Sequence, residues 1–382
     1  MKKIQNQNMY RFLMVLTISA TAGLHVWRTL FDNFAVHVVN LNGSHIGILQ
    51  SVREIPGFLA LLVVYVLFIL KEHRLSALSV LILGIGVAAT GFFPTFYGLL
   101  FTTLVMSFGF HYFETTNQSL TLQYFDEKTS PLVFGKLRSL ASATNVCAGA
   151  IIFILAYVMS YTQLYLLFGL LIMAAAVWAL IRNPTDKNRI PQRKKMILKK
   201  KYWLFYFLTF MAGARRQIFV AFAVFLLVKR FEYSVQEIAV LFLINNIINY
   251  FLSPFIGRCI VRFGERSVLS LEYSSLIIIF ISYAMVESKI VVAFLYVADH
   301  IYFNFAIAIR TFFQKIADPR DIGPSMAVGF TINHIAAVFL PAVGGLLWMV
   351  DYRIPFVGGA VLSFFSLILV QQISGQLMSR QL

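Results

Sequence analysis

The chain has 382 residues, of which 59% are hydrophobic and only 13% are charged, and its formal net charge is +16. Soluble proteins carry about 25% charged residues, so this composition excludes an ordinary soluble domain. Nucleic-acid binding is the competing explanation of a basic chain, but here the basic residues are spread over loops that flank apolar runs. We therefore expect a membrane protein that binds lipids and no nucleic acid.

Apolar runs of membrane-spanning length follow one another along almost the whole chain. A hydrocarbon core of about 30 Å requires about 20 apolar residues of helix. Twelve runs qualify, with short connections that favour antiparallel neighbours. They cover residues 9–37, 45–70, 75–94, 97–124, 132–158, 162–182, 203–229, 234–261, 267–287, 289–316, 324–349 and 353–375. The pattern predicts an all-α membrane protein of twelve transmembrane helices in two six-helix bundles.

One polar stretch, 183–201, separates the predicted bundles 1–182 and 202–382 and contains two prolines and, counting Arg182, nine basic residues. We expect a cytoplasmic linker held against anionic headgroups, with a regulatory or partner-binding loop as the alternative. With the N-terminus inside, 24 Lys and Arg residues lie on the cytoplasmic side and four on the outer side. This asymmetry predicts a multi-pass protein of the cell inner membrane with both termini in the cytoplasm.

The two halves repeat one order of landmarks. Tyr124-Phe125, Pro131 and Gly135 recur 188 residues later as Phe312-Phe313, Pro319 and Gly323, while Tyr10 and Leu49 recur at an offset of 192 as Tyr202 and Leu241. Two parallel halves in a hydrophobic chain are typical of a secondary transporter whose binding site lies at the repeat interface near mid-membrane.

A local motif joins the eighth and ninth runs. Gly257, Arg262, Gly264 and Arg266 stand at the glycine and basic positions of G-x-L-a-D-R-x-G-r-R, although Val261 replaces the usual Asp. Together with the two-times-six organisation, this motif resembles the major facilitator superfamily. We expect glycine to permit a tight turn and arginine to bind helix-terminal carbonyls. The resemblance implies alternating access, with helices 1, 4, 7 and 10 lining a central cavity.

Polar side chains inside the first six runs mark candidate site residues, because a charge at mid-bilayer must face a cavity or a partner. His25, Arg28 and Asp32 share one helical face, either as an internal ion pair or as a cavity wall. Arg53 and Glu54 are adjacent, about 100° apart on a helix, so we expect them to point in different directions. His111, Glu114 and Asn145 are the further candidates in this half.

The seventh run places Arg215, Arg216 and Gln217 about twelve residues beyond its cytoplasmic start, where snorkelling is difficult. We expect at least one arginine to contact an anionic substrate, with pairing to internal carboxylates as the alternative. The predicted substrate-binding residues are Arg215, Arg216, His25, Arg28, His111, Gln217, Asn145, His300, Asn333 and His334, and the predicted proton-coupling residues are Asp32, Glu54, Glu114 and Asp299.

These features predict a monomeric secondary active transporter that moves a small organic, anionic solute by proton-coupled alternating access. Proton-coupled efflux of lipophilic or cationic compounds is the alternative. No catalytic, metal-binding or Walker A motif occurs, so we expect neither an enzyme nor an ATP-driven pump, and no metal or cofactor. The parallel repeat disfavours a passive channel, and the short terminal segments disfavour a sensor with an appended signalling domain.

Overall fold

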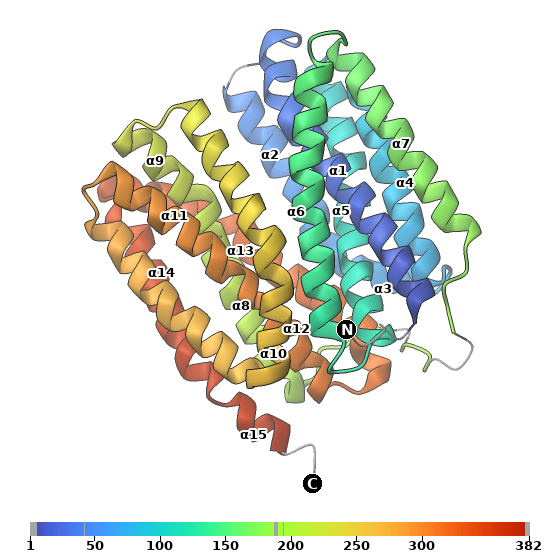
Figure 1. The fold of residues 1–382 in the computed structure, drawn as a ribbon, viewed down its shortest axis with the longest axis vertical. Coiled ribbons are helices and arrows are strands. Elements are labelled where there is room, and N and C mark those ends of the chain that lie inside the picture. The colour runs from blue at the N-terminus through green and yellow to red at the C-terminus, as the bar shows by residue number, and fades with distance from the viewer. Residues whose placement is uncertain (1–5, 42, 187–189, 194, 379–382) are drawn as a thin grey trace. The chain divides into compact units, whose positions relative to one another are not determined.

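A computed structural model describes residues 6–41, 43–186, 190–193 and 195–378, and within them the chain forms helices and connecting turns without a β-strand. Figure 1 shows the helices along the chain. The first six predicted runs correspond to α1 (Gln7–His37), α2 (Gly43–Phe58) continued by η1 (Leu59–Leu62) and α3 (Val63–Val66), α4 (Glu72–Thr90), α5 (Phe96–Tyr124), α6 (Ser130–Leu155) and α7 (Tyr161–Ile181).

The second half is also helical at every predicted run, but several helices are interrupted. It comprises η2 (Lys200–Tyr202), α8 (Trp203–Ile218), the π-helical turn η3 (Phe219–Ala223), α9 (Val224–Phe231), α10 (Val235–Met285), α11 (Lys289–Phe303), η4 (Asn304–Ala306), α12 (Ile307–Ile316), η5 (Pro319–Asp321), α13 (Ile322–Val350), α14 (Arg353–Val370) and α15 (Ile373–Met378). Within the described residues, nine helical stretches are long and apolar enough to cross a membrane.

Local sequence explains where several helices begin and break. Ser160 and Ser234 form capping boxes with the residues three positions later, Gln163 and Glu237, which satisfies amide groups at the starts of α7 and α10. The predicted runs 234–261 and 267–287 both fall within α10, and Gly264 has a φ of 77° between them. Because glycine adopts positive φ without a Cβ clash, the change of direction occurs at this residue.

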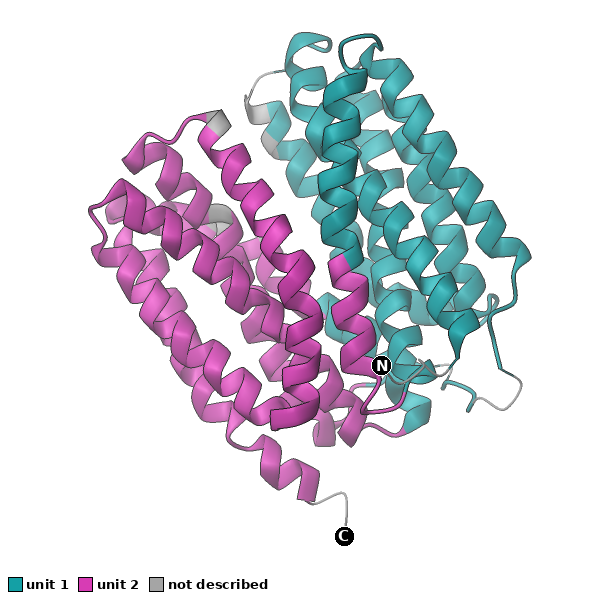
Figure 2. Cartoon of the chain, viewed as in Figure 1, with its two compact units in different colours: residues 1–125, 140–197, 319–331 teal, residues 126–139, 198–318, 332–382 magenta. Residues whose placement is uncertain are grey.

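The chain divides into two compact units, coloured separately in Figure 2. Unit 1 contains residues 1–125, 140–197 and 319–331, and unit 2 contains residues 126–139, 198–318 and 332–382. Two short segments therefore depart from the predicted halves 1–182 and 202–382. In unit 2, the segment 126–139 packs against α10, and in unit 1, Thr331 bonds to the backbone of Phe58 and Leu61.

Part of the predicted linker is held within unit 1 by polar contacts, although residues 187–189 and 194 lie outside the described residues. Arg193 Nη1 lies 2.6 Å from Asp321 Oδ1, and the Asp321 side chain is fully buried. The Gln192 side-chain amide donates to the Pro319 carbonyl at 2.8 Å and accepts from the Gly323 amide at 2.8 Å. These contacts attach the linker to the start of α13.

Replacing Asp321 by Asn tests this attachment while every trypsin site in the linker is kept. A charge-assisted hydrogen bond contributes about 1.5–3 kcal/mol, and partial exposure of Arg193 reduces this to about 1–2 kcal/mol. We expect trypsin to cleave the linker of Asp321→Asn roughly five to thirty times faster than in the unchanged protein. Glu287→Gln, which alters an exposed carboxylate in the turn before α11, is the control. Equal cleavage rates in all three proteins would contradict the attachment.

Candidate functional site

The sequence-predicted polar residues divide between the two units. Unit 1 holds His25, Arg28 and Asp32 on α1, Glu54 on α2, His111 and Glu114 on α5, and Asn145 on α6. Unit 2 holds Arg215, Arg216 and Gln217 on α8, Gly257, Arg262, Gly264 and Arg266 on α10, Asp299 and His300 on α11, and Asn333 and His334 on α13.

In unit 1, Arg53 and Glu54 bind each other. Arg53 Nη2 lies 2.8 Å from Glu54 Oε1, and the two side chains are 20% and 22% exposed. The Arg53 guanidinium lies 5.9 Å from the Trp27 ring centre, and the Ser107 hydroxyl donates to the Arg53 carbonyl. The expectation that these side chains diverge is therefore wrong, because long side chains can bridge the 100° between adjacent helical positions.

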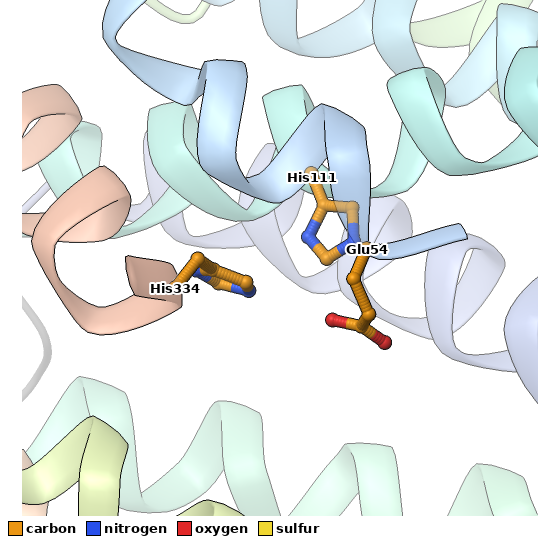
Figure 3. Close-up of side chains that lie close together, drawn as sticks. All are labelled: Glu54, His111 and His334. Atoms are coloured by element: carbon orange, nitrogen blue, oxygen red, sulfur yellow. The ribbon is translucent and has the colours of Figure 1, made fainter. Parts of the chain in front are cut away.

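Glu54 also approaches His111, as Figure 3 shows. A carboxylate oxygen of Glu54 and a ring nitrogen of His111 lie within 4.8 Å of each other. The His111 ring is buried and packs edge-on against Phe330, with 5.8 Å between ring centres. This pair joins α2 to α5 by two groups that can exchange a proton or bind a cation, although two ligands alone fall short of the usual set for a transition metal.

The remaining candidates of unit 1 are more dispersed. Arg28 and Asp32 lie on exposed positions of α1, while the His25 ring reaches α6, where its Nε2 would lie 3.3 Å from a Cβ at Gly149. Glu114 is half-buried, and its side chain has no hydrogen bond or ion pair with any residue that the structure describes. An acidic group in this position can interact with a proton or a cationic solute.

Unit 2 contains a buried charged cluster around Arg215. The guanidinium donates to the Ser366 hydroxyl, stacks 4.4 Å from the Tyr273 ring centre and lies 3.9 Å from Glu272 Oε1. Asp299 completes the cluster, and all five residues are at most 3% exposed. Arg215 is thus engaged by side chains of its own unit.

Three polar atoms in this cluster are not satisfied. Arg215 Nη2, Glu272 Oε2 and Asp299 Oδ2 are buried without a hydrogen-bond partner among the described residues. All three side chains line a small cavity of about 10 Å³, whose other walls are Ala212, Phe219, Leu276, Phe280, Phe303 and Ala306. A cavity of this size holds about one water molecule, which can bridge such groups.

Arg216 differs from its neighbour. It is half-buried, its Nε is buried without a partner, and no carboxylate of the described residues forms an ion pair with it. The adjacent position on α8 turns the side chain about 100° away from that of Arg215. The π-helical turn η3 begins at Phe219, three residues later, and such turns are frequent at functional sites. Arg216 thus differs from Arg215, whose guanidinium contacts Glu272, Ser366 and Tyr273.

A close helix contact places Asn333 beside this part of α8. A Cβ at Gly213 would lie 2.2 Å from the Asn333 carbonyl oxygen, so only glycine permits the observed approach of α13. Asn333 Nδ2 donates to the Thr209 carbonyl at 3.2 Å. Gln217 and His334 are both buried in the same unit. Of the predicted donors on α13, Asn333 therefore lies beside α8, at Thr209 and Gly213.

His300 belongs to a separate polar chain. Its Nε2 lies 2.6 Å from Asn249 Nδ2, Asn304 donates to Asn249 Oδ1 at 2.7 Å, and Arg138 Nε donates to Asn304 Oδ1 at 3.2 Å. The ring nitrogen near Asn249 Nδ2 acts as the acceptor when the amide donates, which leaves the other ring nitrogen as the donor. This chain extends from half-buried His300 to the exposed side chain of Arg138.

The residues of the loop motif make different contacts from those predicted. Gly264 makes the turn, but Gly257 lies within α10, where its missing Cβ allows the Pro131 carbonyl to approach. Arg266 donates to the side chains of Gln371 and Ser374, at 2.9 and 3.2 Å, rather than to helix-terminal carbonyls. Arg262 is exposed and packs against Phe263. The motif therefore joins α10 to the end of α14 and the start of α15.

Four polar residues of unit 2 were not singled out by the sequence: Glu272, Ser366, Asn249 and Asn304. Glu272 carried a usable signal, because an acidic residue followed by a long apolar stretch requires a partner. Its partner, Arg215, lies 57 positions away in the sequence, so its identity depends on how α8 and α10 pack.

The fold and these buried polar groups define a multi-pass membrane protein with ionisable residues inside its apolar helices, as expected for a transporter. The sequence model of the Major Facilitator Superfamily matches residues 7–336, and the chain belongs to this superfamily. It is a transporter and not an enzyme. No curated protein sequence matches the chain.

Solved structures with the same fold include three transporters of low sequence identity. The human organic anion transporter MFSD10 (TETRAN) has a TM-score of 0.77 and 11% identity, with 97% of this chain and 100% of that chain covered. A bacterial homologue of the iron transporter ferroportin has a TM-score of 0.78 and 13% identity, with 96% of this chain and 99% of that chain covered. The transporter FucP has a TM-score of 0.76 and 11% identity, with 95% of this chain and 98% of that chain covered. At these identities the likeness establishes the fold alone.

The Gly213 contact gives a matched pair of substitutions. Gly213→Ala places a methyl group against the backbone of Asn333, whereas Gly345→Ala adds one where no atom lies within 4 Å. We expect Gly213→Ala to lower the melting temperature of the purified protein by several degrees, a cost of about 1–3 kcal/mol for overpacking. Gly345→Ala should leave it unchanged or raise it, because alanine favours helix. Equal melting temperatures for both variants would contradict the close contact.

Proposed function

We propose that this transporter moves a small organic anion across the cell inner membrane, as a monomer, by proton-coupled alternating access. The observation that carries the proposal is Arg216, a half-buried arginine of α8 without an ion-pair partner among the described residues. Burying a guanidinium without an anion costs several kcal/mol. A bound anion would offset this cost, which no carboxylate of the described residues offsets.

The chemistry of arginine narrows the cargo. A guanidinium offers a planar fork of donors that matches carboxylate or phosphate oxygens, and α8 corresponds to helix 7, which lines the central cavity in the superfamily. Asn333 supplies a further polar group beside α8, and His25, Arg28, His111, Gln217, Asn145, His300 and His334 are further candidates. MFSD10, which shares the fold, is itself an organic anion transporter.

Arg215 has a different proposed role from Arg216. Its contacts with Glu272 and Ser366 occupy it within unit 2, so we assign the cargo to Arg216 and treat Arg215 as part of the coupling machinery. The carboxylates Asp32, Glu54, Glu114 and Asp299 remain the candidates for proton coupling. Asp299 lies in the buried Arg215 cluster, and Glu54 lies beside His111.

Proton-coupled efflux of lipophilic cations is the second candidate function. Glu114 favours it, because a half-buried carboxylate without a partner in the described residues can bind a cationic solute. The two functions differ in which side chain the cargo contacts, and therefore in which substitution weakens binding.

A thermal-shift screen of the purified protein against anionic metabolites, phosphorylated compounds and cationic drugs distinguishes them, because a ligand of the folded state raises its stability. We expect an anionic compound to stabilise the protein and Arg216→Gln to weaken its binding by about tenfold or more, the loss of one charge-assisted interaction of about 1.5–3 kcal/mol. Arg216→Lys should not restore it, because an ammonium lacks the planar fork.

The control for this experiment is Arg258→Gln, which removes an exposed arginine of the same unit that packs against Phe255. Its ligand affinity should equal that of the unchanged protein. Stabilisation by cations alone, with binding lost in Glu114→Gln and kept in Arg216→Gln, would replace anion transport by the second function.

The proposed topology has its own test. In a protein whose two cysteines, Cys147 and Cys259, are replaced by serine, a single cysteine at Thr185 should react with a membrane-impermeant maleimide only after the cells are opened. A cysteine at Glu287 should react in intact cells, because the outer side carries few of the basic residues. Labelling of position 185 in intact cells would place the linker outside and reverse the proposed orientation.

A further inference from the structure

We propose that Arg215, Glu272 and Asp299 form a proton-binding site in unit 2, in which the two carboxylates hold one proton between them and release it during transport. The inference rests on the proposed function, because it assigns the coupling proton of that cycle to a particular site. Glu272 is the new member, and Arg215 takes the role of the cation that controls the proton.

The charges in this cluster do not balance without a proton. Glu272 and Asp299 are each 2% exposed; Glu272 Oε1 lies 3.9 Å from Arg215 Nη2, and Asp299 lines the same small cavity as both. The other titratable groups near the carboxylates in the described residues are the Tyr273 and Tyr283 phenols of α10, which are neutral near pH 7. From α14 the cluster receives the Ser366 hydroxyl, and the neighbouring ring of His300 is turned to Asn249.

One arginine therefore faces two buried carboxylates. It neutralises one of them, and a second ionised carboxylate in a buried environment would be so costly that the group binds a proton instead. Because the carboxylates interact, the proton belongs to the pair rather than to Glu272 or Asp299 alone.

The small cavity provides the place for this proton. Glu272 Oε2, Asp299 Oδ2 and Arg215 Nη2 lack hydrogen-bond partners in the described residues, and their side chains line it. A protonated carboxyl can donate its O–H to the other carboxylate or to one water molecule in a volume of about 10 Å³. A Ca²⁺ or Mg²⁺ ion takes six or more ligands, which two carboxylates and about one water molecule do not supply.

The geometry also gives a way to release the proton. Arg215 Nη2 and Glu272 Oε1 are 3.9 Å apart, which is longer than a hydrogen bond, so the ion pair is not closed. A closer approach of the guanidinium favours the ionised carboxylate, and the O–H proton then passes to water, whereas withdrawal of the guanidinium favours proton uptake. The π-helical turn η3, which begins at Phe219 on the cavity wall, gives α8 a place at which to shift.

Infrared spectroscopy of the purified protein tests the site without any cargo, through the C=O stretch of protonated carboxyl groups. At neutral pH we expect the unchanged protein to show a protonated-carboxyl band that shifts after transfer to D₂O. Glu272→Gln and Asp299→Asn should each remove one carboxyl from this band, because the remaining carboxylate forms a one-to-one ion pair with Arg215. Arg215→Gln should roughly double the intensity that Glu272 and Asp299 contribute to the band, because both carboxyls then become neutral.

The matched control is Glu265→Gln. Glu265 is also a 2% exposed carboxylate of α10, but it forms a one-to-one ion pair with Lys315, whose Nζ lies 2.8 Å away, so its removal should leave the band unchanged. Absence of the band from the unchanged protein would overturn the proposal even if every variant failed to fold. Persistence of the band in both folded amide variants would do the same.

Two further outcomes would also overturn it. Loss of the band on addition of sodium chloride, but not choline chloride, would show that the site binds sodium. A band that never exchanges in D₂O while the protein stays folded would show that the proton is not released. Absence of the infrared band would not change the expected binding result for Arg216→Gln. A protein that transports cations would still show the band, so the two proposals can fail separately.

Discussion

A guanidinium buried among apolar helices is the interaction on which much of unit 2 depends. Arg215 is 3% exposed, and an unpaired charge at that depth would cost several kcal/mol. Its compensation comes from separate elements: Ser366 of α14, Glu272 and Tyr273 of α10, and Asp299 of α11. Any change in how these helices pack alters the environment of the cation. The packing of these helices and the electrostatic energy of Arg215 therefore depend on each other.

The pair of Arg53 and Glu54 in unit 1 shows the contrasting case. Adjacent residues of one helix compensate each other, and both side chains are about one-fifth exposed. Such a pair requires no partner from another helix, so it constrains α2 much less than Arg215 constrains α8. Glu54 therefore remains able to interact with His111, whereas the partners of Arg215 come from other helices.

Most of the fold could be predicted from the sequence, because a membrane requires every spanning backbone group to be satisfied within a helix. Apolar length then determines where helices lie, and Gly264 marks the break inside α10. The membership of 126–139 in unit 2 and of 319–331 in unit 1 could not be predicted. It depends on contacts between distant residues, such as Arg193 with Asp321, that leave no local pattern.

The candidate site was predicted less completely. Depth within an apolar run singled out Arg215, Arg216 and Asp299, because an ionisable group inside the membrane is costly unless it faces a partner or a water-filled cavity. Depth does not identify the partner, so Glu272 was missed and the two arginines could not be told apart. Asn249 and Asn304 were missed because an amide, like those of Asn145 and Asn333, does not show its partner in the sequence; only packing shows that they connect His300 to Arg138.

The adjacency of the two arginines is itself a physical link between the proposed cargo and the proposed proton. Adjacent side chains of a helix diverge by about 100°, so Arg215 can face Glu272 and Asp299 while Arg216 faces elsewhere. A helix backbone is stiff over one residue, so a rotation of α8 that follows an anion at Arg216 also moves the Arg215 guanidinium relative to its carboxylates. The ion pair to Glu272 is open by about 1 Å relative to a hydrogen bond of about 2.9 Å, a gap that a small rotation can close. In the proposed cycle, anion binding and proton release are then two consequences of one movement.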